Sequence, residues 1–216
     1  MESHQKYNSA AKAIASSFGV LGGLGGLIHG IGEVLQGNIM IDGFYINSWD
    51  QGPIAMYLGG DPAITIFQSF LIAGIVTLII SGVLIVWSVA FLNNKRSGVV
   101  LMLLSVAMLL SGGGVGPPTL AILAGISASG INSSYDWWRK HTTESLLSLF
   151  SKLWPWIFAL TVINGIFLIV GHVIAAYYFG SPALESIFLN SFGFAVITLI
   201  ISMITGIGYD LFKKRQ

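Results

Sequence analysis

The chain has 216 residues and a net charge of +1; 54% of its residues are hydrophobic and only 9% are charged. Soluble domains carry roughly a quarter charged residues, so this chain lacks the polar surface of a soluble protein. The small net charge gives no electrostatic reason to expect nucleic acid as a partner. Cys is absent, which excludes disulfides, thiolate catalysis and thiolate metal sites. The composition therefore predicts an integral membrane protein whose main partner is the lipid bilayer.

The first apolar run, residues 13–36, follows Lys6 and Lys12 and begins like a secretory signal peptide. It is too long for a cleaved apolar region and has no typical cleavage pattern, so it predicts a retained first transmembrane helix. Gly22, Gly26 and Gly30 form two overlapping G-x-x-x-G steps, which allow close approach of another helix. That helix belongs either to the same bundle or to a second copy in a homo-oligomer.

Residues 37–62 form a loop with three Asp and neither Lys nor Arg, followed by a second apolar span at 63–92. Lys and Arg accumulate in cytoplasmic loops. The loop is therefore predicted outside. Lys95 and Arg96 return the chain to the cytoplasmic side, and the loop is long enough to fold over the outer face as a cap.

A glycine- and proline-rich turn breaks the apolar region 98–131. As one helix this region would be roughly 50 Å long, against a hydrocarbon core of about 30 Å. Six residues end a helix in its middle: Gly112, Gly113, Gly114, Gly116, Pro117 and Pro118. Basic residues flank the region on both sides, so both of its ends are expected in the cytoplasm. The region predicts a helical hairpin that is either re-entrant or made of two short spans.

Residues 132–153 contain Arg139, Lys140 and Lys152 and predict a cytoplasmic amphipathic segment. Two further apolar spans follow at 154–179 and 184–212, joined by a turn without positive charge, and Lys213–Arg215 ends the last span inside. The sequence thus predicts an all-α polytopic bundle in one transmembrane domain. It has four full spans and a central hairpin, with both termini cytoplasmic.

The second and fourth spans resemble each other. Thr77–Ser81 and Thr198–Ser202 have the identical sequence TLIIS, and each span begins near a Pro-Ala pair and ends in a basic cluster. This pattern predicts a 2+2 internal repeat. Parallel repeats in transporters place ligand sites at the interface between the halves.

His29 and Glu33 lie four residues apart and share one face of the first span. His172 in the third span is expected at a similar depth, roughly 8 Å from the midplane. Ionisable groups inside a membrane are functional candidates, and these three could bind a metal, relay protons or bind a polar headgroup. The alternative is that Glu33 sits at the wet interface and His29 bonds a neighbouring helix. Asn164 and Gln68 are further candidates, as ligands or as interhelical hydrogen-bonding groups.

Several segments together resemble a group of small prokaryotic multi-pass membrane proteins that has no assigned activity. They are His29-Gly-Ile-Gly-Glu33, Gln36-Gly-Asn38, Val86-Trp-Ser88 and Gly112–Pro118, and the resemblance covers roughly residues 14–130. It implies a bacterial or archaeal plasma-membrane protein. It transfers no activity and no catalytic residue.

The sequence leaves three functions open. The first is non-enzymatic binding or passage of a small molecule, ion or lipid between the two halves. The second is a membrane enzyme using the His/Glu group for acid–base or metal chemistry. The third is an accessory subunit of a larger membrane complex. No nucleotide, phosphate or zinc-protease motif appears, so the sequence assigns neither a cofactor nor a metal.

Overall fold

The structure is a computed structural model that describes residues 8–49, 62–179 and 182–215. For residues 172, 176, 179 and 182–185 within these ranges the structure describes the backbone alone. The chain is an all-α helical bundle, 78% helical. The predicted fold class is confirmed.

Four helical stretches of the described chain are long and apolar enough to cross a membrane: Ser9–Gln36, Phe70–Ala90, Glu144–Gly171 and Ser186–Lys213. The helices are α1 (Ser9–Gln36), α3 (Phe70–Ala90), α4 (Ser97–Ser111), α5 (Gly116–Ser129), α6 (Asp136–His141), α7 (Glu144–Ile166), α8 (His172–Phe179) and α9 (Pro182–Lys213). A five-residue π-helical segment, η1 (Phe167–Gly171), joins α7 to α8. Two short strands, β1 (Tyr45–Asn47) and β2 (Pro62–Ile64), pair antiparallel.

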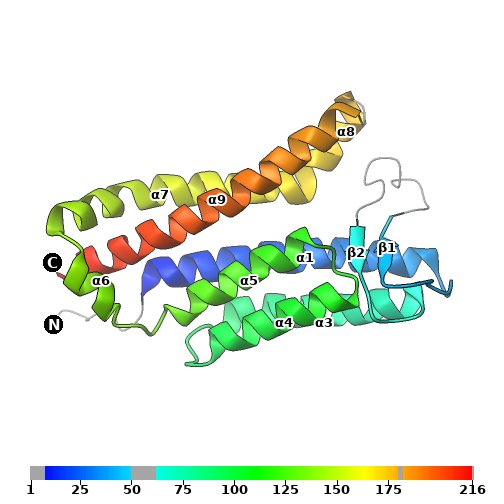
Figure 1. Cartoon of the computed structure of the whole chain (residues 1–216), viewed down its shortest axis with the longest axis horizontal. Coiled ribbons are helices and arrows are strands. Elements are labelled where there is room, and N and C mark those ends of the chain that lie inside the picture. The colour runs from blue at the N-terminus through cyan, green and yellow to red at the C-terminus, as the bar shows by residue number, and fades with distance from the viewer. Residues whose placement is uncertain (1–7, 50–61, 180–181, 216) are drawn as a thin grey trace.

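The helices lie in three tiers (Figure 1). α3 and α4 form one outer tier, α1 and α5 the middle tier, and α7 and α9 the other outer tier. α1 is the most buried of the four long helices and packs mainly on α3 and α5. The α7–α9 pair approaches α1 near the two termini and diverges from it toward α8 (Figure 1). The middle tier therefore lies between the α3–α4 tier and the α7–α9 pair. α1 forms one antiparallel pair with α3, and α7 forms a second with α9.

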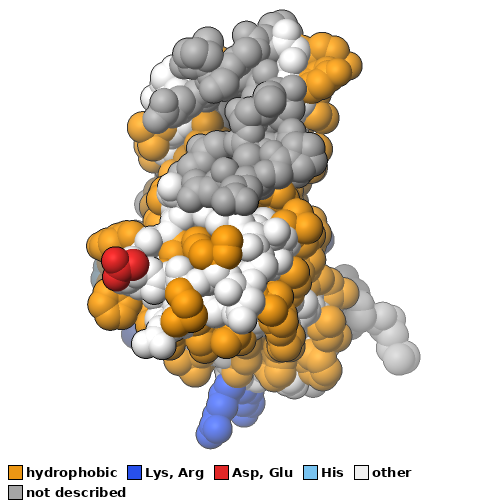
Figure 2. Space-filling model, turned by 90° about the vertical axis from the view of Figure 1, so that its right-hand side faces the viewer, with side chains coloured by type: hydrophobic (Ala, Val, Ile, Leu, Met, Phe, Trp, Pro, Cys, Tyr) orange, Lys and Arg blue, Asp and Glu red, His pale blue; other side chains and the backbone are white. Residues whose placement is uncertain are grey.

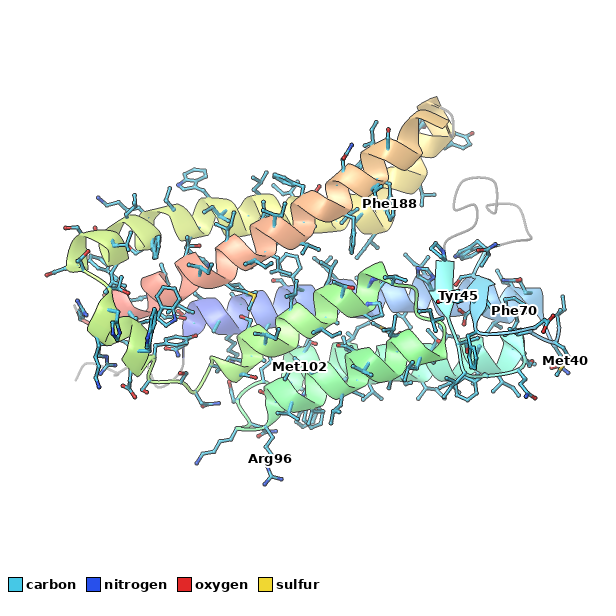
Figure 3. The ribbon with its side chains drawn as sticks, viewed as in Figure 1. Met40, Tyr45, Phe70, Arg96, Met102 and Phe188 are labelled. Carbon is cyan, nitrogen blue, oxygen red and sulfur yellow. The ribbon has the colours of Figure 1, made fainter. Side chains whose placement is uncertain are left out.

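The two ends of the bundle differ in charge. The described Lys and Arg residues all occur near the end that holds both termini, hereafter the basic end. Arg96, at the base of α4, points away from the bundle there (Figure 3). The opposite end carries β1 and β2 and is called the loop end. Figure 2 shows the loop end with a carboxylate at one edge, while the Lys and Arg side chains extend from behind its lower rim.

The hairpin of α4 and α5 stops short of the loop end. Its arms have 15 and 14 residues, or about 21–22 Å of helix. Its turn contacts α3 at Thr77, the eighth residue of that helix, because the Thr77 hydroxyl donates to Ser111 Oγ over 2.9 Å. The turn therefore lies about 10 Å below the loop end of α3.

Residues of the loop end fill the space above the hairpin turn. Thr65 forms an isolated antiparallel bridge with Ser111, and Ile66 N–H donates to the carbonyl of Leu110 over 2.9 Å. Ile46, which pairs with Ala63, and Trp49, which lies against Gly32 of α1, are buried. The loop thus packs over the turn, in which Ser111, Gly112, Gly113 and Gly114 are buried.

Two element boundaries differ from the predicted ranges. Residues 63–69 are extended rather than helical: β2 pairs with β1 there, and α3 begins only after Ser69. The third long helix begins at Glu144 rather than near 154, because the Thr143 hydroxyl caps it by accepting from Leu146 N–H. The apolar runs in the sequence do not by themselves identify where α3 and α7 begin.

The glycine stripe of α1 is filled by the bundle itself. A side chain at Gly22 would meet Pro117 and Ala121 of α5, one at Gly26 would meet Met108 and Ser81, and one at Gly30 would meet Leu78. These glycines therefore allow α3, α4 and α5 to approach α1 closely.

The identical TLIIS segments both direct their hydroxyl residues inward. Thr77 and Ser81 are buried on α3, and Thr198 and Ser202 are buried on α9. Each of these helices belongs to one antiparallel pair. The relation of the two pairs by duplication stays a prediction.

Candidate functional site

His29 and Glu33 are connected through a serine of the loop. The distance from His29 Nδ1 to Ser48 Oγ is 2.9 Å, and Ser48 Oγ donates to Glu33 Oε1 over 3.1 Å. The exposed fractions are 8% for His29 and 0% for Ser48 and Glu33. Ser48 has one proton and gives it to Glu33, so in this arrangement it accepts the Nδ1 proton of His29. The three side chains form one buried hydrogen-bonded chain.

The hairpin turn encloses this chain. Gly112, with φ of 120°, lies against the Glu33 carboxyl, and Gly114, with φ of 75°, lies against the His29 ring at Nε2. A Cβ atom at either position would collide with those side chains. Glycine is therefore required at both positions, because each has a positive φ and each lies in close contact with a side chain of α1. The predicted turn residues and the His/Glu pair meet in one place.

Glu33 has one carboxyl oxygen without a hydrogen-bond partner. Among the described residues, none donates to or accepts from Oε2, although the side chain is fully buried. An ionised carboxyl in such a place costs several kcal/mol unless it is paired. The group is stabilised either by carrying a proton or by binding a cation. Buried polar atoms of this kind are unusual and require an explanation.

Hydroxyl groups surround the adjacent part of the turn. Thr65 Oγ1 donates to the Ser111 carbonyl over 3.2 Å, Thr77 donates to Ser111 Oγ, and Ser111 Oγ donates to the Met108 carbonyl over 3.0 Å. Thr65, Thr77 and Ser111 are at most 1% exposed. This hydroxyl network fixes the turn to α3 and to the loop, and so fixes Gly112 against Glu33.

An apolar cavity of about 60 Å³ adjoins His29. It lies between the middle tier and the α7–α9 pair, and Figure 3 marks Phe188, one of the α9 residues that line it. Among the described lining residues, His29 is the one with a titratable side chain; the others are Leu21, Gly25, Ile28, Gly116, Pro117, Leu120, Leu168, Ile169, Phe188 and Phe192. The π-helical segment contributes Leu168 and Ile169, and π-bulges are frequent at functional sites.

The remaining predicted site residues lie elsewhere or are not described. The backbone of His172 begins α8, but its side chain lies outside the described part of the structure. Asn164 donates to the Ser191 carbonyl over 2.8 Å and connects α7 with α9. Gln68 is exposed at the loop end. In the described ranges, no three His, Asp or Glu side chains are grouped as a metal ion would require.

A second buried carboxyl, Asp210 on α9, was not singled out from the sequence. It accepts from the Ala10 N–H over 3.0 Å, the Ala11 N–H over 3.2 Å and the Ser9 hydroxyl over 3.2 Å. It therefore caps the first turn of α1 from another helix. Burial, with Asp210 nearby, raises the pKa of Tyr135 above its ordinary value. An acidic residue inside an apolar span was a usable signal for Asp210.

Ser48 carried no comparable signal. It is a common polar residue in a loop, and only the folded loop brings it between His29 and Glu33. Comparison with known protein families, with curated proteins and with solved structures finds no significant match for this chain.

Proposed function

We propose that this protein resides in the plasma membrane of a prokaryotic cell and binds a small amphiphilic molecule in the cavity beside His29. Its basic end faces the cytoplasm, with both termini, because Lys and Arg accumulate on that side. The loop end faces outward. The four long apolar helices support membrane insertion.

The cavity beside His29 carries this proposal. Its lining is almost wholly apolar and ends at one hydrogen-bonding side chain, the pattern expected of small-molecule sites. A cavity holds one water when it offers roughly 10–15 Å³, so about 60 Å³ accommodates several non-hydrogen atoms. The cavity is partly open, so the rest of an apolar chain would extend toward lipid.

Binding of a small molecule explains the structure better than docking of a larger partner through the glycine stripe. Gly22, Gly26 and Gly30 are covered by α3, α4 and α5. A partner helix would have to displace one of these to reach them. The cavity needs no such displacement.

The test uses decanol, which joins an apolar chain to one hydroxyl. Native mass spectrometry of the full-length protein in lipid nanodiscs would measure its binding. Ile169→Phe should fill the cavity and weaken binding at least tenfold. Ile163→Phe is the matched control, because Ile163 on α7 is 65% exposed and outside the cavity lining. Equal binding by both variants, or no binding by the wild type, would contradict the proposal.

A further inference from the structure

We propose that the protein binds an anionic phospholipid in a second cavity, at the basic end of the bundle. An acyl chain would enter the cavity between α5 and α9, and the headgroup phosphate would lie beside Tyr135, Arg139 and Arg215. This cavity is separate from the one beside His29, since the two share no described lining residue. The inference therefore goes beyond the proposed function and does not depend on it.

The second cavity has a volume of about 110 Å³. Its sides come from α1, α5 and α9 and are mostly apolar; the described lining residues are Ala11, Ile126, Ser127, Gly130, Tyr135, Met203 and Ile207. Ile126 is 46% exposed, so the cavity borders the outer surface of the bundle, which faces lipid in a membrane. Since one water needs roughly 10–15 Å³, the cavity has room for part of an acyl chain.

Tyr135 forms the polar end of this cavity. Its hydroxyl lies against Gly130, where a Cβ atom would collide with it. Asn8 lies beside the phenolic oxygen but does not take its proton, because Asn8 Oδ1 has no hydrogen-bond partner among the described groups. The Tyr135 hydroxyl can therefore donate to a ligand oxygen. Tyr135 also has a φ of 51°, which is rare for a large side chain, and such conformations cluster at ligand-binding sites.

Two guanidinium groups lie beside Tyr135. The Arg139 N–H donates to the Tyr135 carbonyl over 2.9 Å, one helical turn away. The Arg139 side chain donates to the Ser134 carbonyl over 3.4 Å, and Arg215 donates to the Arg139 carbonyl over 3.4 Å. Both arginine side chains are exposed. These long bonds leave most of their N–H donors for a phosphate.

The nearby carboxylates have other partners. Asp136 accepts from the Ser134 hydroxyl over 2.6 Å, and Asp210 accepts from the first turn of α1. Lys140 and Lys214, each next to one of the arginines in the sequence, add two exposed positive charges. The charge at this end of the cavity therefore favours an anion.

An anionic phospholipid matches both parts of the site. Its acyl chains suit the apolar lining, and its phosphate suits guanidinium groups, which bind phosphate through two parallel hydrogen bonds. Trp137, which is 63% exposed, places this region at the level of the lipid headgroups. A zwitterionic headgroup adds a cation that the arginines repel, and a soluble phosphate has no chain for the cavity. Basic pockets between transmembrane helices bind anionic headgroups in this way.

Native mass spectrometry of the delipidated full-length protein in neutral detergent tests the proposal. Palmitoyl-oleoyl phosphatidylglycerol has a net negative charge, and phosphatidylcholine with the same acyl chains has none. We expect the phosphatidylglycerol to bind at least about tenfold more tightly, because each basic residue near the headgroup strengthens the attraction. Inorganic phosphate at the same concentration should not displace it.

Removing the two guanidinium charges should abolish this preference. Arg139→Gln combined with Arg215→Gln removes both charges from exposed side chains. Lys95→Gln combined with Arg96→Gln is the matched control, because it removes two exposed charges of the same end at the base of α4. Arg96 points away from the bundle there (Figure 3). The control should keep the preference.

Two further variants test the cavity itself. Ile207→Phe should fill it and weaken phosphatidylglycerol binding, whereas Ile204→Phe, on the same helix, 38% exposed and outside the lining, should not. Tyr135→Phe removes the hydroxyl alone and should weaken binding about threefold to fivefold, as expected for one hydrogen bond.

Equal binding of the two lipids by the wild type would refute the site. An equal loss of preference in the two charge variants would also refute it, because it would indicate general attraction to the basic end. Equal binding by the Ile207 and Ile204 variants would exclude the cavity, and displacement by inorganic phosphate would overturn the lipid as its occupant. Each of these results leaves decanol binding beside His29 untouched, so the two proposals fail separately.

Discussion

Two buried carboxyl groups, Asp210 and Glu33, lie at opposite ends of α1 and differ in how completely they are hydrogen-bonded. Asp210, 3% exposed, accepts three hydrogen bonds from the first turn of α1. Glu33, fully buried, accepts one from Ser48 and has an oxygen without a described partner. The first arrangement stabilises a helix junction. The second leaves one buried carboxyl oxygen without a hydrogen bond among the described groups.

The largest effect is expected when Asp210 is removed. Asp210→Ala would leave the first N–H groups of α1 without their acceptor and should lower the free energy of unfolding by about 2 kcal/mol, the upper range for loss of a helix cap. Unfolding in mixed micelles, followed by tryptophan fluorescence, measures this. Glu33→Gln should change stability by less than about 1 kcal/mol, because the amide keeps the side-chain volume and can still accept the Ser48 hydrogen bond, and a typical hydrogen bond contributes only about 1 kcal/mol net. Equal losses would remove the distinction between the two carboxyls.

The next effect concerns the glycine that lies against Glu33. Gly112→Ala should cost about 1–3 kcal/mol for the left-handed backbone, plus the collision with the Glu33 carboxyl. Gly43→Ala is the matched control, since Gly43 has φ of 93° and open space around a Cβ atom. The difference between the two variants, again from micelle unfolding, isolates the collision. That difference should shrink in a Glu33→Ala background, and an unchanged difference would mean that Gly112 does not contact Glu33.

A smaller effect is expected from the hydroxyl network that fixes the turn. Thr77→Val removes the hydrogen bond to Ser111 and keeps the side-chain volume. Interhelical hydrogen bonds in membranes average about 0.6 kcal/mol, which sets the expected loss. Thr119→Val, whose hydroxyl bonds the Val115 carbonyl of its own turn, is the control. A Thr77 variant no less stable than the Thr119 variant would show that this bond does not hold the hairpin.

The smallest effect appears only at alkaline pH. Burial raises the pKa of Tyr135 above its ordinary value of 10.0. The folded protein therefore holds the phenolic proton more tightly than the unfolded chain, and stability falls as the pH rises above about 10. Tyr135→Phe should reduce the slope of this alkaline loss and leave the slope near neutral pH unchanged. Melting temperatures across this range would show it; parallel curves for the two proteins would contradict it.

The sequence predicted the parts that depend on local patterns. Long apolar runs identify the four spans, and the run of Gly and Pro at residues 112–118 identifies the hairpin. The spacing of His29 and Glu33 places them on one face. The identity of the bridging group could not be predicted, because Ser48 reaches them only through the folded loop. The partners of Asp210 are 199–201 residues away along the chain, and no local pattern specifies such a contact. The π-helical segment η1 likewise has no composition signal in the sequence.

The hairpin also determines the direction of everything that follows it. α4 runs away from the basic end and α5 returns to it, so together they leave the direction of the chain unchanged. α7 therefore runs in the same direction as α1. Losing the whole hairpin would leave the orientation of α7 and α9 across the bilayer unchanged. Losing a single arm would invert α7 and α9 and carry the Lys213–Arg215 cluster to the opposite face.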